Sequence, residues 1–431
     1  MSRPSDNLPW VTTSIRKLIK KRHKLHKKAK RSKLRADWEN FREARRSIKK
    51  VIKKAESDYV KDSIDDLKLD QRAFWKYIRS KRVDSSSIPA LKKDTKLLIT
   101  DSEKAAALAD QFNSVFTTER INVIPFTPSK YPAMTDIKIR SKGVLKLLKN
   151  LDTSKASGPD EITARMLKET AEEIAPVLAS LFQQSLDTGN LPDDWLLANV
   201  TALFKKGSRE SPENYRPVSL TAIMCKLLEH ILHSQISKHL EAHNILTTLQ
   251  HGFRKGHSCV TQLIQVVDDW MEGVEKSQQI DAAILDFTKA FDCVPHERLK
   301  SKLHHYGIRN NTLNWITRFL TQRQQRVVIN GESSKWHPVI SGVPQGTVLG
   351  PLLFLIYIND IVEDLQCNIR LFADDAILYT TVSSVQDCSK LQNDLDKVCQ
   401  WASKWQMTFN PKKCNTMSVG LMNQKHPIIT P

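Results

Sequence analysis

Two adjacent aspartates, Asp374 and Asp375, carry the strongest chemical signal in this sequence. They lie between two short apolar runs, residues 368–372 and 376–380, whose composition is typical of β-strands. The pattern predicts a β-hairpin with both carboxylates at its tip. Like charges this close repel each other when they are partly desolvated, unless a cation neutralises them. A divalent metal ion is therefore the expected reason to keep both, although a lone Asp-Asp pair is more commonly a solvated turn.

A third carboxylate, Asp286, ends another apolar run at residues 282–285. A folded sheet brings side chains that are remote in sequence to one edge, and the segment between Asp286 and Asp374 is long enough to hold a connecting helical segment. The three carboxylates would form a cluster suited to two magnesium ions, which hold both oxygens of an in-line phosphoryl displacement. These residues therefore predict nucleotidyl transfer.

A loop rich in glycine and proline, residues 341–351, lies between these carboxylates in the sequence. Its composition predicts a shaped backbone that allows close approach, followed by an apolar helix over residues 352–359. The order of carboxylate strand, Pro-Gln-Gly loop and Ala-Asp-Asp hairpin resembles that of reverse transcriptases. The amino-acid sequences of these motifs are most similar to those of the reverse transcriptases of non-LTR (LINE-type) retrotransposons of the jockey-like clades.

The resemblance extends over roughly residues 140–420, because further motifs follow in the family's order. They are KASGPD (155–160), LPDDW (191–195), FKKG (204–207), NYRPVSL (214–220), QHGFR (250–254) and FNPKK (409–413). The resemblance implies an α+β fold with the palm and fingers of a right-hand polymerase, preceded by a basic helical N-terminal extension. It also implies an RNA-directed DNA polymerase that adds deoxynucleotides to a primer 3′-hydroxyl by two-metal chemistry. The implied partners are an RNA template, a DNA primer and deoxynucleoside triphosphates, with two Mg²⁺ ions, or Mn²⁺ in their place.

The same resemblance implies roles for individual residues at the reaction centre. Asp286, Asp374 and Asp375, together with the backbone carbonyl of Phe287, would hold the metal ions. Lys413 would protonate the pyrophosphate leaving group.

Further residues would contact the nucleotide and the template. Lys205, with Lys206 as an alternative, and Arg216 would hold the triphosphate. Phe291 would exclude a 2′-hydroxyl, unless it is an ordinary core residue. The remaining implied contacts are Gln345 and Gly346 against the nascent base pair and template backbone, Arg254 against the template or as a plain surface arginine, and Asp292 in a structural role.

The charge distribution indicates a polyanionic partner. The chain has 66 Lys and Arg against 47 Asp and Glu, a formal net charge of +19. Most of this excess lies in residues 1–60, where apolar residues three, four or seven apart predict one or two long amphipathic helices. Nucleic acid is the leading partner and an anionic membrane surface the weaker one. A solvated helix face and a nuclear-import signal are the alternatives for this segment.

We expect three parts: a basic helical extension (1–83), a linker and helical segment (84–135), and reverse transcriptase fingers and palm (136–431). Within the middle part, Asp101 or Ser102 is expected to cap a helix that runs to Phe116. No endonuclease or thumb is expected, as in a fragment of such an element.

The expected location is nuclear and cytoplasmic, with reduced cysteines. No apolar run reaches the about eighteen residues of a membrane span, so no membrane partner is expected. The first rival function is a catalytically silent, nucleic-acid-binding remnant of a polymerase. An intron maturase-type enzyme ranks third.

Overall fold

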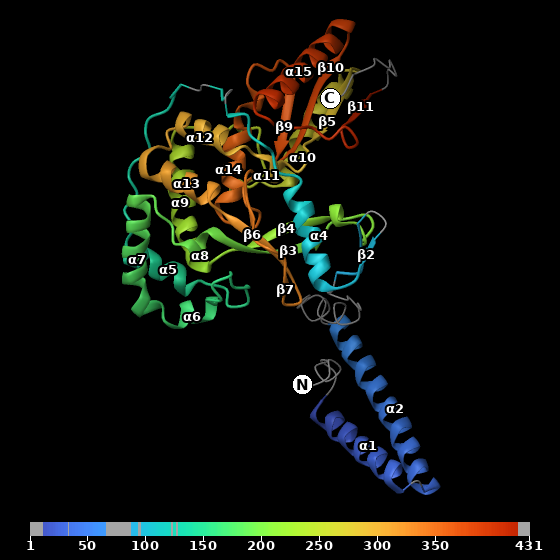
Figure 1. Cartoon of the computed structure of the whole chain (residues 1–431). Coiled ribbons are helices and arrows are strands. Elements are labelled where there is room, and N and C mark those ends of the chain that lie inside the picture. Colours follow the sequence, from blue (N-terminus) through green and yellow to red (C-terminus); the bar gives the residue numbers. More distant parts are fainter. Residues whose placement is uncertain are drawn as a thin grey trace. The chain divides into compact units, whose positions relative to one another are not determined.

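Figure 1 shows a computed structural model of the chain, which divides into two compact units at residues 1–87 and 88–431. The structure describes residues 12–32, 34–65, 88–93, 96–121, 124–125 and 128–420. Each unit is described by itself below.

The first unit contains a hairpin of two helices, α1 (Thr13–Ser32) and α2 (Arg35–Asp65). They correspond to the amphipathic pattern in the sequence, because apolar residues on their facing sides, including Ile15, Ile52 and Tyr59, pack together. α1 is rich in Lys and Arg and contains no acidic residue. The described part of this unit is therefore a thin apolar seam with a strongly cationic surface.

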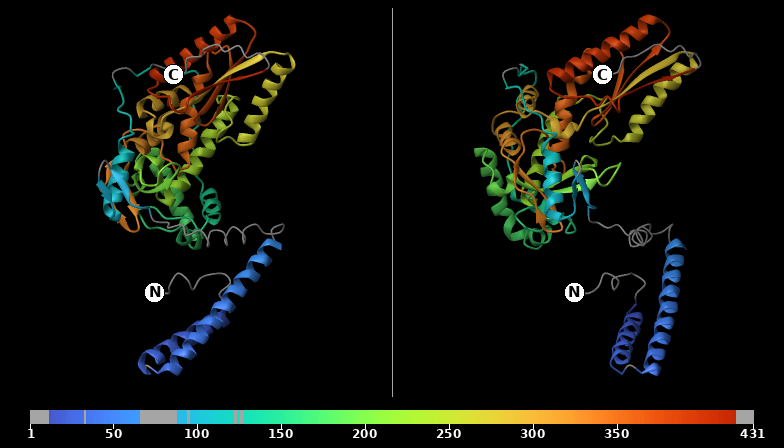
Figure 2. Two further views of the ribbon diagram at one scale, coloured as in Figure 1. Left: turned by 90° about the vertical axis from the view of Figure 1, so that its right-hand side faces the viewer. Right: turned by 45° about the vertical axis from the view of Figure 1, so that its right-hand side comes forward.

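The second unit contains a four-stranded antiparallel sheet in the order β11-β5-β10-β9. Its strands are β5 (Gln279–Asp286), β9 (Asn368–Phe372), β10 (Asp375–Val382) and β11 (Asn415–Val419). Successive side chains in a strand point to opposite faces, and both faces are apolar here. One face packs on α15 (Val385–Lys404) and the main core, and the other on α10 (Cys259–Glu275). In Figure 2 the red helix α15 and the yellow helix α10 flank these strands.

A second sheet has the order β4-β3-β6-β7, with β8 also paired to β6. Its strands are β3 (Leu197–Phe204), β4 (Tyr215–Leu220), β6 (Gln324–Ile329), β7 (Glu332–Ser333) and β8 (His337–Pro338). β3 and β4 are antiparallel, whereas β3 and β6 are parallel. A small separate hairpin joins β1 (Leu91–Lys93) to β2 (Lys96–Leu98). The predicted combination of helices with mainly antiparallel sheets is confirmed.

Helix α4 (Asp101–Asn113) packs on the second sheet through Leu108 and Phe112. Its N-cap is Thr100, whose hydroxyl accepts from the Glu103 N–H while the Glu103 carboxylate accepts from the Thr100 N–H. The prediction that Asp101 or Ser102 caps this helix is therefore wrong by one position, and the helix ends before Phe116. Thr100 and Glu103 form a capping box, which satisfies two backbone donors reciprocally.

The remaining helices surround a large apolar core to which one face of the first sheet contributes. They are α5 (Ser141–Lys149), α6 (Ala164–Glu169), α7 (Ala171–Thr188), α8 (Asp193–Leu196), α9 (Ile223–Ala242), α11 (Ala290–Cys293), α12 (His296–His305), α13 (Asn310–Thr321) and α14 (Leu349–Ile358), with 3₁₀ turns at Pro212–Asn214 and Asn359–Val362. Trp195, Trp315 and Phe319 are among the fully buried side chains of this core. Of the described helices, none is both long and apolar enough to cross a membrane.

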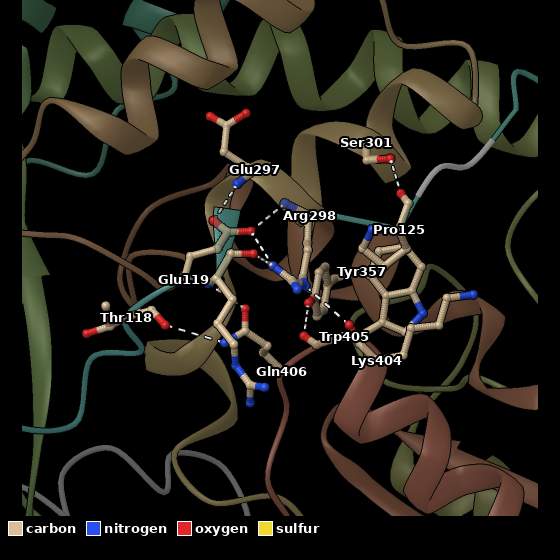
Figure 3. Close-up of polar contacts among 11 residues, drawn as sticks. Thr118, Glu119, Pro125, Glu297, Arg298, Ser301, Tyr357, Lys404, Trp405 and Gln406 are labelled. Atoms are coloured by element: carbon tan, nitrogen blue, oxygen red, sulfur yellow. Dashed lines mark hydrogen bonds and ion pairs between the residues drawn. The ribbon is translucent and has the colours of Figure 1, made fainter. Parts of the chain in front are cut away.

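Residues 117–120 tie the region before residue 136 to this core (Figure 3). The Glu119 carboxylate accepts hydrogen bonds from the N–H groups of Glu297 and Arg298, at 2.9 and 3.0 Å, and pairs with the Arg298 guanidinium at 3.0 Å. It therefore caps α12 as well as neutralising a buried arginine. The Arg120 N–H donates to Gln406 Oε1 at 3.0 Å. This segment is thus an integral part of the second unit.

Candidate active site

The pairing of β5 with β10 brings the predicted carboxylates to one end of the first sheet. In its register Asp375 lies directly opposite Asp286, and Asp374 occupies the turn that precedes β10. The apolar runs that flank these aspartates predict the hairpin of β9 and β10, and this hairpin is confirmed. Residues remote in the sequence are therefore neighbours because of strand register alone.

The electrostatics of this cluster reflect crowding of like charges. Burial raises the pKa of Asp374, and the nearby Asp286 raises it further. Burial also raises the pKa of Asp375, and Asp374 and Asp286 add to the shift. The opposite effect holds for Lys205, whose pKa is lowered by burial and then by Arg216 and Lys413. Ligands of opposite charge would reduce the repulsion within each set: a cation among the aspartates, and an anion among Lys205, Arg216 and Lys413.

Lys413 is the direct partner of Asp286. Its ammonium donates a hydrogen bond to Asp286 Oδ2 and forms an ion pair with it. A turn positions Lys413, since its N–H donates to the Asn410 carbonyl, and the Asn410 N–H in turn donates to the Asp286 carbonyl at 2.8 Å. The predicted leaving-group acid therefore lies beside a predicted metal ligand.

The donor chemistry of the cluster fits a divalent cation, because carboxylate oxygens are the ligands that Mg²⁺ prefers and their mutual repulsion favours a cation between them. In the described part of the chain, however, no three Asp, Glu, His or Cys side chains are gathered as a metal-binding group. The ammonium of Lys413 already occupies one oxygen of Asp286. A cation that uses all three carboxylates would have to displace it.

A cleft of about 740 Å³ opens onto Asp286 and Asp374 and is lined from both sheets. Most of the predicted site residues lie on its walls: Lys205, Arg216, Asp286, Phe287, Phe291, Gln345, Gly346, Asp374 and Lys413. The alternative Lys206 and the structural candidate Asp292 line it as well. Arg254 does not. The cleft thus brings together Lys205, directly after β3, and Arg216 of β4 with carboxylates from β5 and the β9–β10 turn.

Phe291 and Phe287 have different surroundings. Phe291 stacks on Phe354 of α14, with ring centroids 4.5 Å apart, and keeps one side on the cleft. Phe287 is fully buried and stacks on Phe409 at 4.3 Å. Phe291 therefore packs against the core on one side and lines the cleft on the other.

The Pro-Gln-Gly loop is held against β4 and α11. Gly346 has a φ of +98°, and a Cβ there would lie 2.7 Å from the Ser219 carbonyl oxygen. The glycine is thus required by close approach of the protein's own strand. The Ser219 N–H donates to the Gln345 carbonyl at 2.8 Å, and the Gln345 side-chain amide donates to Asp292 Oδ1 at 3.1 Å. Asp292 therefore orients Gln345.

The helix after this loop starts earlier than predicted, at Leu349 instead of residue 352. The cause is Glu229 of α9, whose carboxylate accepts from the N–H groups of Val348 and Leu349 at 2.7 and 3.0 Å. Glu229 is fully buried and acts as a cap supplied from another helix. Nothing local in the sequence predicts this contact.

The turn at residues 250–254 is fastened to the Ala-Asp-Asp turn. Gln250 Oε1 accepts from the Ala373 N–H at 2.8 Å, and Gln250 Nε2 donates to the Ala373 carbonyl at 3.1 Å. A Cβ at Gly252 would lie 2.3 Å from the Ala373 nitrogen, so only glycine fits. Gln250 and Gly252 together set the backbone that carries Asp374.

This turn presents Phe253, and not Arg254, to the cleft. The Arg254 guanidinium donates to the Thr247 carbonyl at 2.6 Å and so holds the turn itself. Its neighbour Phe253 lines the cleft, is 58% exposed, and has a φ of +54° that is unusual for a bulky residue. Its ring lies edge-on to Phe291 at 5.9 Å. An exposed aromatic residue beside the predicted template contact is the signal that the sequence reasoning missed.

Comparisons with known proteins agree with this geometry. A family model described as "Reverse transcriptase (RNA-dependent DNA polymerase)" matches residues 204–428. A second model, described as "Female sterile protein K10 C-terminal domain", matches residues 11–68.

Among curated relatives, the probable RNA-directed DNA polymerase from transposon BS of Drosophila melanogaster is 26% identical, over 94% of this chain and 47% of the relative. The RNA-directed DNA polymerase from mobile element jockey of the same species is 31% identical, over 63% of this chain and 31% of the relative. The corresponding jockey protein of Drosophila funebris is 29% identical, over 72% of this chain and 34% of the relative. The chain spans less than half the length of each of these relatives.

Proposed function

Because this chain belongs to the reverse transcriptase (RNA-dependent DNA polymerase) family, we propose that it is an RNA-directed DNA polymerase of a non-LTR, jockey-like retrotransposon. It would transfer deoxynucleotides from their triphosphates to the 3′-hydroxyl of a primer on an RNA template. We assign the first sheet with α10 and α15 to the palm of a right-hand polymerase. We assign β3, β4 and the helices α5 to α9 to the fingers.

The observation that carries this proposal is the single cleft that joins two sets of opposite charge. Asp286 and Asp374 lie on one wall, and Lys205 and Arg216 lie on another. A triphosphate in this cleft would be held by a point charge and a planar guanidinium, which are complementary devices for phosphate oxygens. Its α-phosphate would face the carboxylates. Positioning and charge neutralisation supply most of the rate in such transfers.

Asp286, Asp374 and Asp375, with the Phe287 carbonyl, would hold divalent cations, Mg²⁺ or in its place Mn²⁺. Such ions, when bound, lower the pKa of a hydroxyl nucleophile and neutralise phosphate charge. The chain's own part is to keep the three carboxylates at one end of a sheet and to keep the attacking and leaving groups apart.

Lys413 would act on the leaving group, whereas the metal ions would also act on the attacking hydroxyl. Its ammonium pairs with Asp286 in the structure, so a cation held by Asp286 would compete with Lys413 for that carboxylate. Lys413 also lines the cleft, and when not paired with Asp286 it would donate a proton to the leaving pyrophosphate. Gln345, oriented by Asp292, would meet the nascent base pair, and Phe291 would pack against the sugar of the incoming nucleotide.

Primer extension on an RNA template tests the proposal. The purified chain should add deoxynucleotides in Mg²⁺ or Mn²⁺, and Asp374→Asn should abolish addition while leaving primer–template binding intact. A chain that binds primer–template but adds no nucleotide under any metal would be the catalytically silent remnant instead.

A further inference from the structure

A second groove, remote from the reaction centre, lies between α5 and α9 and has a volume of about 640 Å³. Four basic residues line it: Lys138, Arg140, Lys142 and Lys146. The carboxylate among its lining residues is Asp136. The groove therefore has a strong excess of positive charge, which has no part in the chemistry described above.

The charges of these four side chains are not neutralised by the carboxylates of the described residues. Within the described residues, none of them forms an ion pair with a carboxylate. Lys149, on the same helix α5 but outside the groove, is by contrast paired with Glu172 at 2.5 Å. The charges that face the groove are thus left for an external anion, whereas a neighbouring charge is neutralised internally.

The helix α5 presents these charges because its two sides differ. Val144 and Leu148 are fully buried in the main core. Lys142 and Lys146 are one helical turn apart and exposed on another side. Between the basic residues, Ile139, Leu147 and Ile231 give the groove an apolar floor. Of the described residues, no Phe, Tyr or Trp lines it, so it lacks a broad platform on which bases would stack.

Helix α9 links the groove to the cleft, because it follows β4, which lines the cleft. The end of β4 touches the Pro-Gln-Gly loop at Gly346, and α9 begins directly after β4. His230 of α9 lines the groove, about 10 Å further along the helix at 1.5 Å per residue. Lys226, one turn before His230, adds a partly buried positive charge on the way.

We propose that the groove between α5 and α9 binds the sugar–phosphate backbone of the single-stranded template ahead of the reacting base pair. This inference rests on the proposed function, because only a template continues past a pair at which the primer ends. The contacts are to phosphates and to the apolar sides of sugars, so the site is independent of template sequence.

The test compares primer–templates whose single-stranded template overhang is either about two or about ten nucleotides long, in RNA and in DNA. Affinity is measured by fluorescence anisotropy at several salt concentrations. The parent chain should bind the long overhang more tightly than the short one. The double variant Lys142→Gln/Lys146→Gln should lose roughly three- to tenfold in affinity for the long overhang and lower its salt slope by about 1.4, since each single-stranded phosphate contact contributes about 0.7.

The matched control is Lys276→Gln/Lys335→Gln, which removes the same charge from exposed lysines outside both sites. It should leave the preference for the long overhang unchanged. Equal losses on both overhangs in the Lys142/Lys146 variant, or an equal effect of the control, would overturn the proposal. A loss confined to RNA or to DNA overhangs would identify which template the groove accepts.

Single-nucleotide addition on the short overhang separates this inference from the proposed function. The Lys142/Lys146 variant should add one nucleotide to that substrate at the parental rate. If the parent itself adds none, the polymerase proposal fails, while the anisotropy comparison still decides whether the groove binds a strand.

Discussion

The side-chain amide of Gln250 pairs with the backbone of Ala373 through two hydrogen bonds, one donated and one accepted. Ala373 has a φ of +54°, a conformation that costs energy in a residue other than glycine. The amide compensates because it satisfies both backbone groups of that buried residue at once. The direction of the following Asp374 therefore depends on a buried side chain that does not line the cleft.

Replacing Gln250 with Ala should destabilise the second unit and lower primer extension. The change leaves the N–H and carbonyl of Ala373 buried without partners, at a cost of roughly 1–3 kcal/mol. The measurements are the urea midpoint and the extension rate at saturating metal. Gln322→Ala removes an exposed amide as the control and should change neither. A Gln250 variant with parental extension would show that Asp374 is positioned without the clamp.

Replacing Lys413 with Ala should move metal affinity and activity in opposite directions. The ammonium competes with a cation for Asp286, so its removal should tighten Mg²⁺ or Mn²⁺ binding by roughly threefold or more, while extension falls for lack of the leaving-group acid. Calorimetric titration of the metal and single-turnover extension are the two measurements. Weaker metal binding in Lys413→Ala would contradict the competition.

Phe291 should control the choice of sugar. Replacement by Val opens the cleft wall beside the nucleotide, and incorporation of ribonucleotides relative to deoxynucleotides should rise by about 10-fold or more, since a steric contact of this size is worth 1–3 kcal/mol. Phe354→Leu disturbs the same aromatic stack from the core side and serves as the control. If the two variants lose stability alike and neither changes sugar preference, Phe291 is only a packing residue.

The raised pKa of Asp292 should make the free energy of unfolding depend on pH. Burial raises its pKa from 3.8 to about 6. The folded chain therefore binds this proton more tightly than the unfolded chain, and stability falls as pH rises from about 4 to about 6. Asp292→Asn removes this pH-dependent destabilisation and should raise the free energy of unfolding at pH 7 by roughly 1–2 kcal/mol, with no difference below pH 4. Urea unfolding across this pH range is the measurement.

The same residue has a matched test in catalysis. Asn keeps a carbonyl that accepts from Gln345, whereas Asp292→Ala does not. The Ala variant alone should raise the KM for deoxynucleotides. A parallel rise in both variants would mean that the negative charge, not the hydrogen bond, is what matters.

The cationic hairpin of α1 and α2 should add to nucleic-acid binding without contributing to chemistry. Removing residues 1–87 leaves the second unit whole, since the units divide at that point. The salt slope of primer–template binding should fall by about 0.7–0.9 for each phosphate that the hairpin neutralises, and the rate of single-nucleotide addition should stay constant. An unchanged slope would favour an import signal or a solvated helix face for this segment.

Local patterns in the sequence are enough to predict the hairpin at Asp374 and Asp375 and the strand that ends at Asp286. Both rest on apolar alternation beside charged residues, which depends on neighbours in the chain. The capping box at Thr100 and Glu103 is local too, and its pattern of Thr followed three residues later by Glu marks the true start of α4 one position before the predicted cap.

Contacts between distant segments could not be predicted in this way. The Glu229 carboxylate that caps α14 comes from α9, and the Gln250 amide reaches a turn far along the chain. For the same reason the sequence does not predict that Phe253 lines the cleft: which residue of this turn faces the cleft depends on the positive φ of Phe253 and on the packing of the turn against Ala373. Likewise, a side chain at position 346 would collide with β4, and the sequence of the loop alone does not predict this contact.

The register of β5 against β10 also has a kinetic consequence. Asp286 and Asp375 become neighbours only after the long segment between them, with α11 to α14, has closed into a loop. Closing such a loop costs chain entropy before any contact across it forms, so pairings of this kind are slow compared with the local helices. In refolding from denaturant, helical signal should therefore recover before the chain can add a nucleotide. The pairing of Asp286 with Asp375 is therefore expected to be among the last contacts to form during folding.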